Sequence, residues 1–394
     1  MSSEKRSAPP DARSGFGPIE NEPPQRLFHR MGLAPAGGLG TGRRALLFAA
    51  VTWLPIMAWA TLTSHLVDTP AGEPLVEHFG VHVRCLIAIP LFILAEAGLN
   101  GSVKRIAAQF RSSGAVQPAQ EPAFEQSLLR VRSLRDSSLP WVFVLGLTLT
   151  WLFVSHPDAH QDAYSWAVSG GGTLGFGGWW FAYVVRPIFL ALLLGWIWRI
   201  FLLTSWLWRV GRLELSLVAS HADRSAGLGF VEKLPIAIAP VTFGLSSVIA
   251  GHWAHELAYH DAVLKKFTMP AAAFAILWTL FCLLPLLALG PALMKFRARA
   301  IPAYGEVVGE QGRLVYRRWI KKEKVDDPLL GAPEIGPVVD TNSIFEAVER
   351  LGFVPIRKAT LAMTLLPLAL PMIAAVAVKI PIKQLILGLV KAVV

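Results

Sequence analysis

Seven apolar stretches, spaced along almost the whole chain, limit what this sequence can fold into. They cover about residues 45–64, 81–99, 139–154, 180–208, 236–258, 269–294 and 359–378. A bilayer core of about 30 Å needs about 20 apolar residues at ~1.5 Å of helix rise per residue. Only 16% of the 394 residues are charged, whereas soluble domains carry about 25%. We therefore expect an all-α integral membrane protein with about seven transmembrane helices.

Residues 1–42 precede the first stretch and differ from it in composition. They contain Pro9, Pro10, Pro18, Pro23 and Pro24 among scattered charges, without an apolar core. This composition is typical of a disordered tail, and the lack of an apolar core excludes a cleavable signal peptide. We predict a disordered cytoplasmic tail over residues 1–42.

The distribution of Lys and Arg predicts the orientation. Segments 100–138, 209–235 and 295–358 are rich in Lys and Arg, whereas residues 65–80 and 155–178 contain none. The positive-inside rule places the basic segments in the cytoplasm. We therefore expect a cytoplasmic N-terminus. Lys265 and Lys266 in the third external loop are the exception to the rule.

Helices are also predicted outside the seven spans. Apolar residues recur at helical spacing in segments 121–136 and 342–351, which predicts a small helical cytoplasmic layer. The same spacing over residues 381–394, with Lys383 and Lys391 on the other side, predicts an external amphipathic helix that is too short to cross the bilayer.

The net charge of +10 does not indicate nucleic-acid binding, because the basic residues fall between apolar spans rather than on one polar domain. The expected partners are the lipid bilayer and, at the basic layer, an anionic lipid or a cytoplasmic protein. Cys85 and Cys282 lie in apolar spans and are interpreted as packing residues. The sequence leaves the oligomeric state open.

Four charged residues fall within the predicted spans: Arg84, Glu96, Arg186 and Arg199. A charge at bilayer depth costs at least ~2.5 kcal/mol on insertion scales, so each should face protein or water. The topology puts Glu96 and Arg199 in the cytoplasmic half, which predicts an ion pair between the second and fourth spans. Such charges can line an ion or solute path, or they can be structural, with arginines that extend toward the interface.

The loop from His221 to Phe230 gathers polar groups at the cytoplasmic mouth of the fourth and fifth spans. Its candidate residues are His221, Asp223, Arg224, Gly227 and Gly229. They can hold an anionic ligand, or Asp223 can cap the turn while Arg224 attaches it to a neighbouring loop. Because the sequence has no phosphate-loop, GxSxG or cofactor fingerprint, it favours a protein that is not an enzyme and assigns no catalytic residue.

This loop resembles the His-Pro-Asp-Arg-Ala-Gly-Gly-Leu-Gly-Phe loop of a family of uncharacterised bacterial multi-pass membrane proteins. The likeness extends to His82-Val83-Arg84 before Pro90 and Leu94-Ala95-Glu96, to Leu134-Arg135-Asp136-Ser137, to Pro328-Leu329-Leu330-Gly331 and to Val354-Pro355. Ala222 replaces the loop proline and Ser225-Ala226 replaces Ala-Gly, which implies a less constrained loop. The resemblance implies a multi-pass protein of the bacterial inner membrane and no activity.

Most of the histidines fall on the predicted external side: His65, His78, His82, His156, His160, His252, His255 and His260. On a helix, His252, Glu256 and His260 share one face, and His255 lies beside them. Imidazole and carboxylate suit Zn²⁺, so a divalent metal at His252, His255, Glu256 and His260, with ligands from the loop at 156–162, is the one cofactor that the sequence allows. The alternatives are a pH-sensing group and solvated histidines.

Two functions of different classes stay open. The charges within the spans, and the prolines that kink most spans, favour a channel or transporter for a small ion or solute. The basic layer and the histidine-rich external face favour instead a non-transporting membrane scaffold or sensor with a cytoplasmic docking layer. We see no internal repeat, which counts against the inverted-repeat transporter folds.

Overall fold

A computed structural model of the chain describes residues 16–35, 38–67, 73–154, 157, 162–169, 172–324 and 336–379. Within these ranges the chain is helical and has no β-strand, so the predicted all-α fold is confirmed. The predicted helix at 381–394 and most of the histidine loop at 156–162 lie outside the described residues.

Seven helical segments are long and apolar enough to cross a membrane, and the chain is a multi-pass membrane protein. They are α2 (Thr41–Leu62), α3 with α4 (Phe79–Val83, Ile89–Ser112), the segment Pro118–Val154 that contains α5 (Glu121–Asp136) and α6 (Leu139–Val154), α7 with α8 (Phe176–Trp180, Arg186–Val210), α9 (Lys233–Tyr259), α10 (Lys265–Leu287) and α14 (Lys358–Ala377). The other helices are α1 (Pro23–Arg30), α11 (Gly290–Val315) and α13 (Gly336–Glu349).

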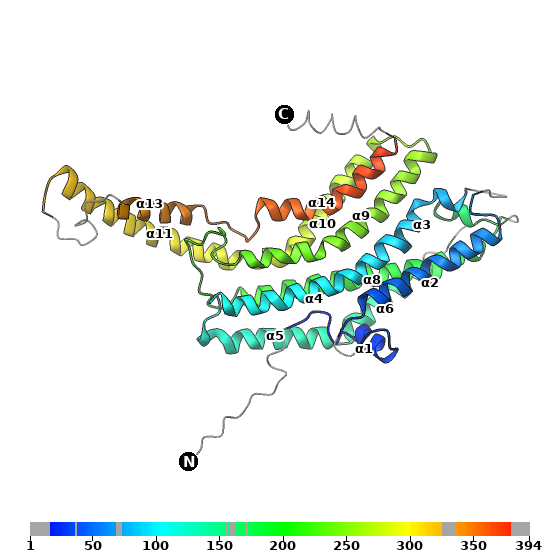
Figure 1. The fold of residues 1–394 in the computed structure, drawn as a ribbon, viewed down its shortest axis with the longest axis horizontal. Helices are drawn as coiled ribbons and strands as arrows, with labels where there is room; N and C mark the ends of the chain where they lie inside the picture. The colour runs from blue at the N-terminus through cyan, green and yellow to red at the C-terminus, as the bar shows by residue number, and fades with distance from the viewer. Residues whose placement is uncertain are drawn as a thin grey trace, which may run out of the picture.

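The central helix is α9, which lies between α14 and α4 (Figure 1). Of its apolar stretch, 61% is buried, the largest share among the seven spans. Gly251 of α9 approaches Gly80 of α3 so closely that an added Cβ at Gly251 would lie 3.4 Å from the Gly80 nitrogen. Small residues permit such contacts between membrane helices, whose association depends on van der Waals packing. The contact brings the first turn of α3 close to the last turns of α9.

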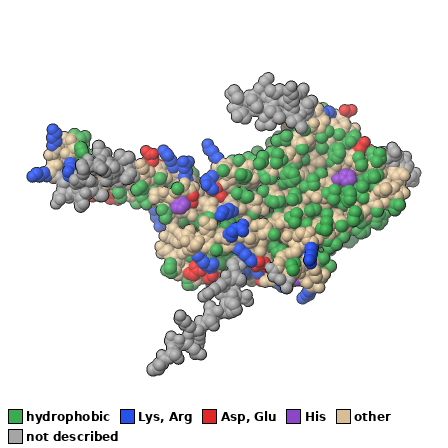
Figure 2. Space-filling view, viewed as in Figure 1, with side chains coloured by type: hydrophobic (Ala, Val, Ile, Leu, Met, Phe, Trp, Pro, Cys, Tyr) green, Lys and Arg blue, Asp and Glu red, His purple; other side chains and the backbone are tan. Residues whose placement is uncertain are grey.

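The two ends of the bundle differ in chemistry. The basic end (residues 100–138, 209–232 and 288–357) contains α5 and an arm made of α11 and α13, and the histidine end (residues 63–82, 162–178 and 255–266) contains the connections before α3 and after α9. In Figure 2, Lys and Arg side chains gather toward the basic end, while hydrophobic side chains cover much of the remaining surface. The positive-inside rule predicts that the basic end is cytoplasmic.

The predicted disordered tail is wrong for residues 16–35, which fold against the bundle. Phe16 and Ile19 are 0% exposed, and the ring centroids of Phe16 and Trp206 lie 5.9 Å apart. After them, α1 packs beside the start of α2, where the rings of Phe28 and Phe48 lie edge to face. A few side chains that fit an existing surface are enough to order this segment, and the average composition of residues 1–42 does not show them.

The sixth span and the basic layer also differ from the prediction. Instead of continuing to residue 294, α10 ends at Leu287, and α11 begins at Gly290. Together α11 and α13 form an arm that extends beyond the bundle (Figure 1). The predicted helix at 121–136 coincides with α5, whereas the one predicted at 342–351 begins earlier, at Gly336.

Two spans contain a π-helical turn directly before a proline. The turn Arg84–Ala88 joins α3 to α4 before Pro90, and the turn Phe181–Val185 joins α7 to α8 before Pro187. Proline has no N–H and its ring collides with the carbonyl of residue i−4, so a wider turn relieves the collision. An arginine lies at each π-helical turn: Arg84 is the first residue of one turn, and Arg186 directly follows the other.

Candidate functional site

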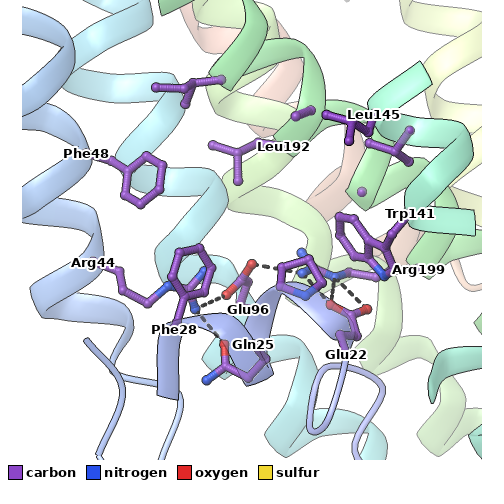
Figure 3. A pocket seen from close by; sticks show the side chains of 15 residues that line it. Glu22, Gln25, Phe28, Arg44, Phe48, Glu96, Trp141, Leu145, Leu192 and Arg199 are labelled. Carbon is purple, nitrogen blue, oxygen red and sulfur yellow. Dashed lines mark hydrogen bonds and ion pairs between the residues drawn. The ribbon is translucent and has the colours of Figure 1, made fainter. Parts of the chain in front are cut away.

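Four buried charges meet toward the basic end of α4 and α8 (Figure 3). Glu96 lies at the centre, with Oε1 at 2.9 Å from Arg199 Nη2 and Oε2 at 2.7 Å from Arg44 Nη1. Arg199 also binds Glu22, with 2.7 Å between Nη2 and Oε2. None of the four side chains is more than 5% exposed. The two positive and two negative charges compensate one another, and the expected pairing of Glu96 with Arg199 is present.

Arg44, Glu22 and Gln25 belong to this network and were not identified from the sequence. Arg44 Nη1 donates a hydrogen bond of 3.0 Å to Gln25 Oε1, and its guanidinium carbon lies 4.1 Å from the centre of the Phe28 ring. Glu22 and Gln25 lie in the segment that composition assigned to a disordered tail. The one available signal was the position of Arg44 beside the first span.

An inner cavity of about 240 Å³ adjoins this network, between α2 and α6 (Figure 3). Its polar floor is formed by the network, and its walls include Phe28, Phe48, Leu145 and Leu192. The buried Nε atom of Arg44 and the buried Nε1 atom of Trp141 have no hydrogen-bond partner. Two unused donors beneath apolar walls suit a small molecule with an acceptor at one end.

An outer cavity of about 340 Å³ lies toward the histidine end, and Arg84 and Arg186 line it. Arg84 lies 5.2 Å from the centre of the Phe181 ring, and Arg186 donates to the Tyr164 hydroxyl. Across the described residues, neither arginine has a carboxylate at ion-pair distance, and Arg84 Nε is buried without a partner. Among the described residues, nothing at ion-pair distance compensates the positive charges of these two arginines, and such a cavity suits an anion.

An aromatic contact separates the two groups of arginines along the helices. Phe92 lies between Arg84 and Glu96 in sequence, Phe189 lies between Arg186 and Arg199, and the two rings stack with centroids 5.5 Å apart. Phe92 is fully buried, and its carbonyl accepts a hydrogen bond of 3.0 Å from Trp196 Nε1. Along α4 and α8 the stack lies between the level of Arg84 and Arg186 and the level of Glu96 and Arg199.

At the histidine end, three imidazoles surround one carboxylate. Glu73 Oε2 lies 3.0 Å from His78 Nε2 and 3.1 Å from His255 Nε2, and Glu73 Oε1 lies 3.0 Å from His260 Nε2. Burial, reinforced by repulsion from the neighbouring histidines, lowers the pKa of His78 to about 3. His78 is therefore neutral at pH 7.

This cluster differs from the predicted group of His252, His255, Glu256 and His260. The structure brings His255 and His260 together, whereas Glu256 Oε2 lies 3.4 Å from Lys266 Nζ. His252 lines the outer cavity beside His78 and His255 but is not one of the histidines paired with Glu73. The other two members of the cluster are Glu73 and His78, which the sequence analysis did not include in this group. Helical spacing identifies residues on one face of α9 but not the segment before α3 that packs against it.

The candidate loop at the basic end is a tight turn organised by Asp223. The Asp223 carboxylate accepts hydrogen bonds from the backbone nitrogens of Ser225, Gly227 and Gly229 at 2.9, 3.1 and 2.7 Å. His221 Nδ1 lies 2.9 Å from Asp223 Oδ1, and the carbonyl of Arg224 accepts a bond from the Gly352 nitrogen. Asp223 therefore has little remaining capacity for a ligand, which favours the structural interpretation of this loop.

No family model, curated protein or solved structure matches the chain. The resemblance of the loop from His221 to Phe230 stays a prediction, and the geometry of the cavities and clusters is the basis on which a function can be proposed.

Proposed function

We propose that the protein moves a small anionic solute across the bacterial inner membrane, with the basic end in the cytoplasm. The observation that carries the proposal is the outer cavity, where Arg84 and Arg186 face a common space with no carboxylate of the described residues at ion-pair distance. Uncompensated arginines at bilayer depth are costly, so they are expected where they bind a ligand. Their guanidinium groups suit carboxylate, phosphate and sulfate.

The buried network supplies the second half of the path. An anion that passes the Phe92 and Phe189 stack meets Arg44 and Arg199, which Glu96 and Glu22 neutralise. The anion can replace one carboxylate as the partner of an arginine, so neither arginine has to become unpaired. The free energy of opening the network is then smaller than that of breaking a buried pair in the absence of an anion.

Uptake into proteoliposomes tests the proposal. The probes are radiolabelled inorganic phosphate, sulfate and acetate, and the expected result is uptake of at least one of them well above that of empty vesicles. Arg84→Gln and Arg186→Gln are expected to lower the initial rate about 10-fold or more, because a hydrogen bond to a charged group contributes about 1.5–3 kcal/mol. The matched control is Arg317→Gln, which removes an exposed arginine of the arm that pairs with Glu323.

Transport is excluded for these solutes if wild-type vesicles take up no probe faster than empty ones. Equal loss of uptake in Arg84→Gln and in Arg317→Gln would show that the effect does not come from the outer cavity. Size-exclusion profiles of each variant in detergent establish that the compared proteins are folded.

One observation favours the alternative of a non-transporting scaffold. On the arm, Trp319 and Ile320 are 50% and 67% exposed and lie among Arg317, Arg318 and Lys321. Exposed apolar and basic side chains together suit an anionic lipid surface. If so, trypsin should cleave the arm more slowly in nanodiscs of phosphatidylglycerol than in nanodiscs of phosphatidylcholine, and equal rates contradict this role.

A further inference from the structure

We propose that Glu73, His78, His255 and His260 form a site for a divalent transition-metal ion, and that Zn²⁺ is the ion this donor set suits best. Glu73 and His78 belong to the segment before α3, and His78 directly precedes that helix. His255 lies in the last turns of α9, and His260 directly follows it. Three imidazole nitrogens and a carboxylate are the usual ligands of zinc in proteins. The proposal is independent of transport, because it concerns binding alone.

The donor atoms of Glu73, His78 and His255 lie close enough together to share one ion, and His260 lies beside two of them. One donor each from Glu73, His78 and His255 lies within 4.8 Å of the others, and His255 Nε2 lies 3.3 Å from His260 Nε2. Zinc bonds of about 2.0–2.2 Å in tetrahedral geometry put neighbouring donors roughly 3.3–3.6 Å apart. The observed separations of 3.0 to 3.3 Å between donors are close to that range.

His255 presents the lone pair of one ring nitrogen to the cluster. Its Nδ1 lies 2.8 Å from the carbonyl oxygen of Glu77, which can only accept, so Nδ1 carries the proton. A neutral imidazole then presents a lone pair at Nε2. Nε2 faces Glu73 Oε2 and His260 Nε2 at 3.1 and 3.3 Å, where a proton or a metal ion can link the three groups, and a bound Zn²⁺ would replace the proton.

The surroundings of the cluster also fit a metal. A ligand histidine usually donates its second N–H to a carbonyl or carboxylate, which fixes its tautomer and orientation, as His255 does with Glu77. Ser165 Oγ lies 3.2 Å from Glu73 Oε2 and 3.1 Å from His78 Nε2. His78 and His255 are 6% and 4% exposed, so the ligands are held in place by packing, and His260 at the surface leaves a route of entry.

Calorimetric titration of the chelator-treated, detergent-purified protein with Zn²⁺ tests the site. We expect one ion per chain, and Co²⁺ in its place should give the visible absorption of a tetrahedral complex. Glu73→Gln and His78→Asn should weaken binding by more than the ~10-fold that loss of an outer-shell partner already causes. The matched controls are Glu256→Gln, a carboxylate at the same end that pairs with Lys266, and His221→Asn at the basic end.

A footprint on the unmodified protein covers the case in which ligand variants do not fold. Zn²⁺ should protect His255 and His260 from diethyl pyrocarbonate while His221 reacts at an unchanged rate. The proposal is overturned by the absence of Zn²⁺ binding and of a Co²⁺ spectrum, by equal protection of His221, or by binding that survives Glu73→Gln and is lost in Glu256→Gln. Since none of these measurements involves transport, the anion proposal can fail without affecting this one.

Discussion

Glu96 on α4 and Arg199 on α8 form an ion pair of 2.9 Å whose side chains are 1% and 5% exposed. The pair is the middle of a chain of contacts that continues to Arg44 on α2 and to Glu22 before α1. Three membrane-spanning segments and the N-terminal segment are therefore joined by buried charges. Such an arrangement holds only while every charge keeps a partner.

Replacing Glu96 by Gln should destabilise the protein by about 3–5 kcal/mol, because it leaves two buried arginines with one carboxylate. The measurement is unfolding by denaturant in detergent. In the double variant Glu96→Gln/Arg199→Gln the loss should be smaller than the sum of the two single losses. Glu121→Gln, which removes a partner of the partly exposed Arg111, should cost less than about 1 kcal/mol.

Phe16→Ala should lower stability by about 3–5 kcal/mol, the usual loss for a buried phenylalanine. Phe16 is fully buried against Trp206, although it precedes every predicted span. The thermal midpoint in detergent measures the effect, with Phe353→Ala, at a side chain that is 59% exposed, as the control. Equal midpoints for wild type and Phe16→Ala would mean that residues 16–35 do not fold against the bundle.

If the stack of Phe92 and Phe189 is the barrier of the proposed path, Phe189→Ala should raise the passive entry of iodide into proteoliposomes, because it removes half of that stack. The rate is followed by quenching of an enclosed halide-sensitive dye. Phe143→Ala on α6, at a side chain that is 70% exposed, should leave the rate unchanged. An unchanged rate in Phe189→Ala would place the barrier elsewhere.

Acid should weaken the turn around Asp223. Burial opposes ionisation, but hydrogen bonds from the nitrogens of Ser225, Gly229 and Gly227 outweigh it and lower the pKa of Asp223. A carboxyl whose folded-state pKa lies below its unfolded value of about 3.9 contributes stability above that pH, and the contribution is lost as pH falls through the folded pKa. In Asp223→Asn this part of the pH dependence of the thermal midpoint should disappear, and a pH profile identical to that of wild type would contradict the assignment.

Gly251→Leu should weaken Zn²⁺ binding without removing a ligand. A side chain at Gly251 meets the backbone of Gly80 and Phe79, so α9 must move away from α3 and carry His255 away from His78. Gly98→Leu is the matched control, because an added Cβ there meets nothing within 4 Å. Titration of both variants with Zn²⁺ should show a loss of affinity in the first alone, and equal affinities would show that this helix contact does not set the ligand geometry.

The membrane class of the protein, its seven apolar spans and the positions of its charged residues along those spans could be predicted from the sequence alone. Residues 139–154 were predicted as a span and form α6, and 121–136 were predicted as a helix and form α5. Because a helix rises by a constant ~1.5 Å per residue, position along a span converts directly into depth. Glu96 and Arg199 could be paired from the sequence for this reason.

Only the tertiary structure decided which segments meet. Glu22 reaches Arg199, and Glu73 reaches three histidines, from segments in which no periodic pattern marks a partner. Helical spacing grouped Glu256 with His252, but it could not show that Gly251 lets α9 approach α3 and thereby brings His255 to His78. Periodicity records the face and depth of a residue, whereas contacts between distant segments depend on how their surfaces fit.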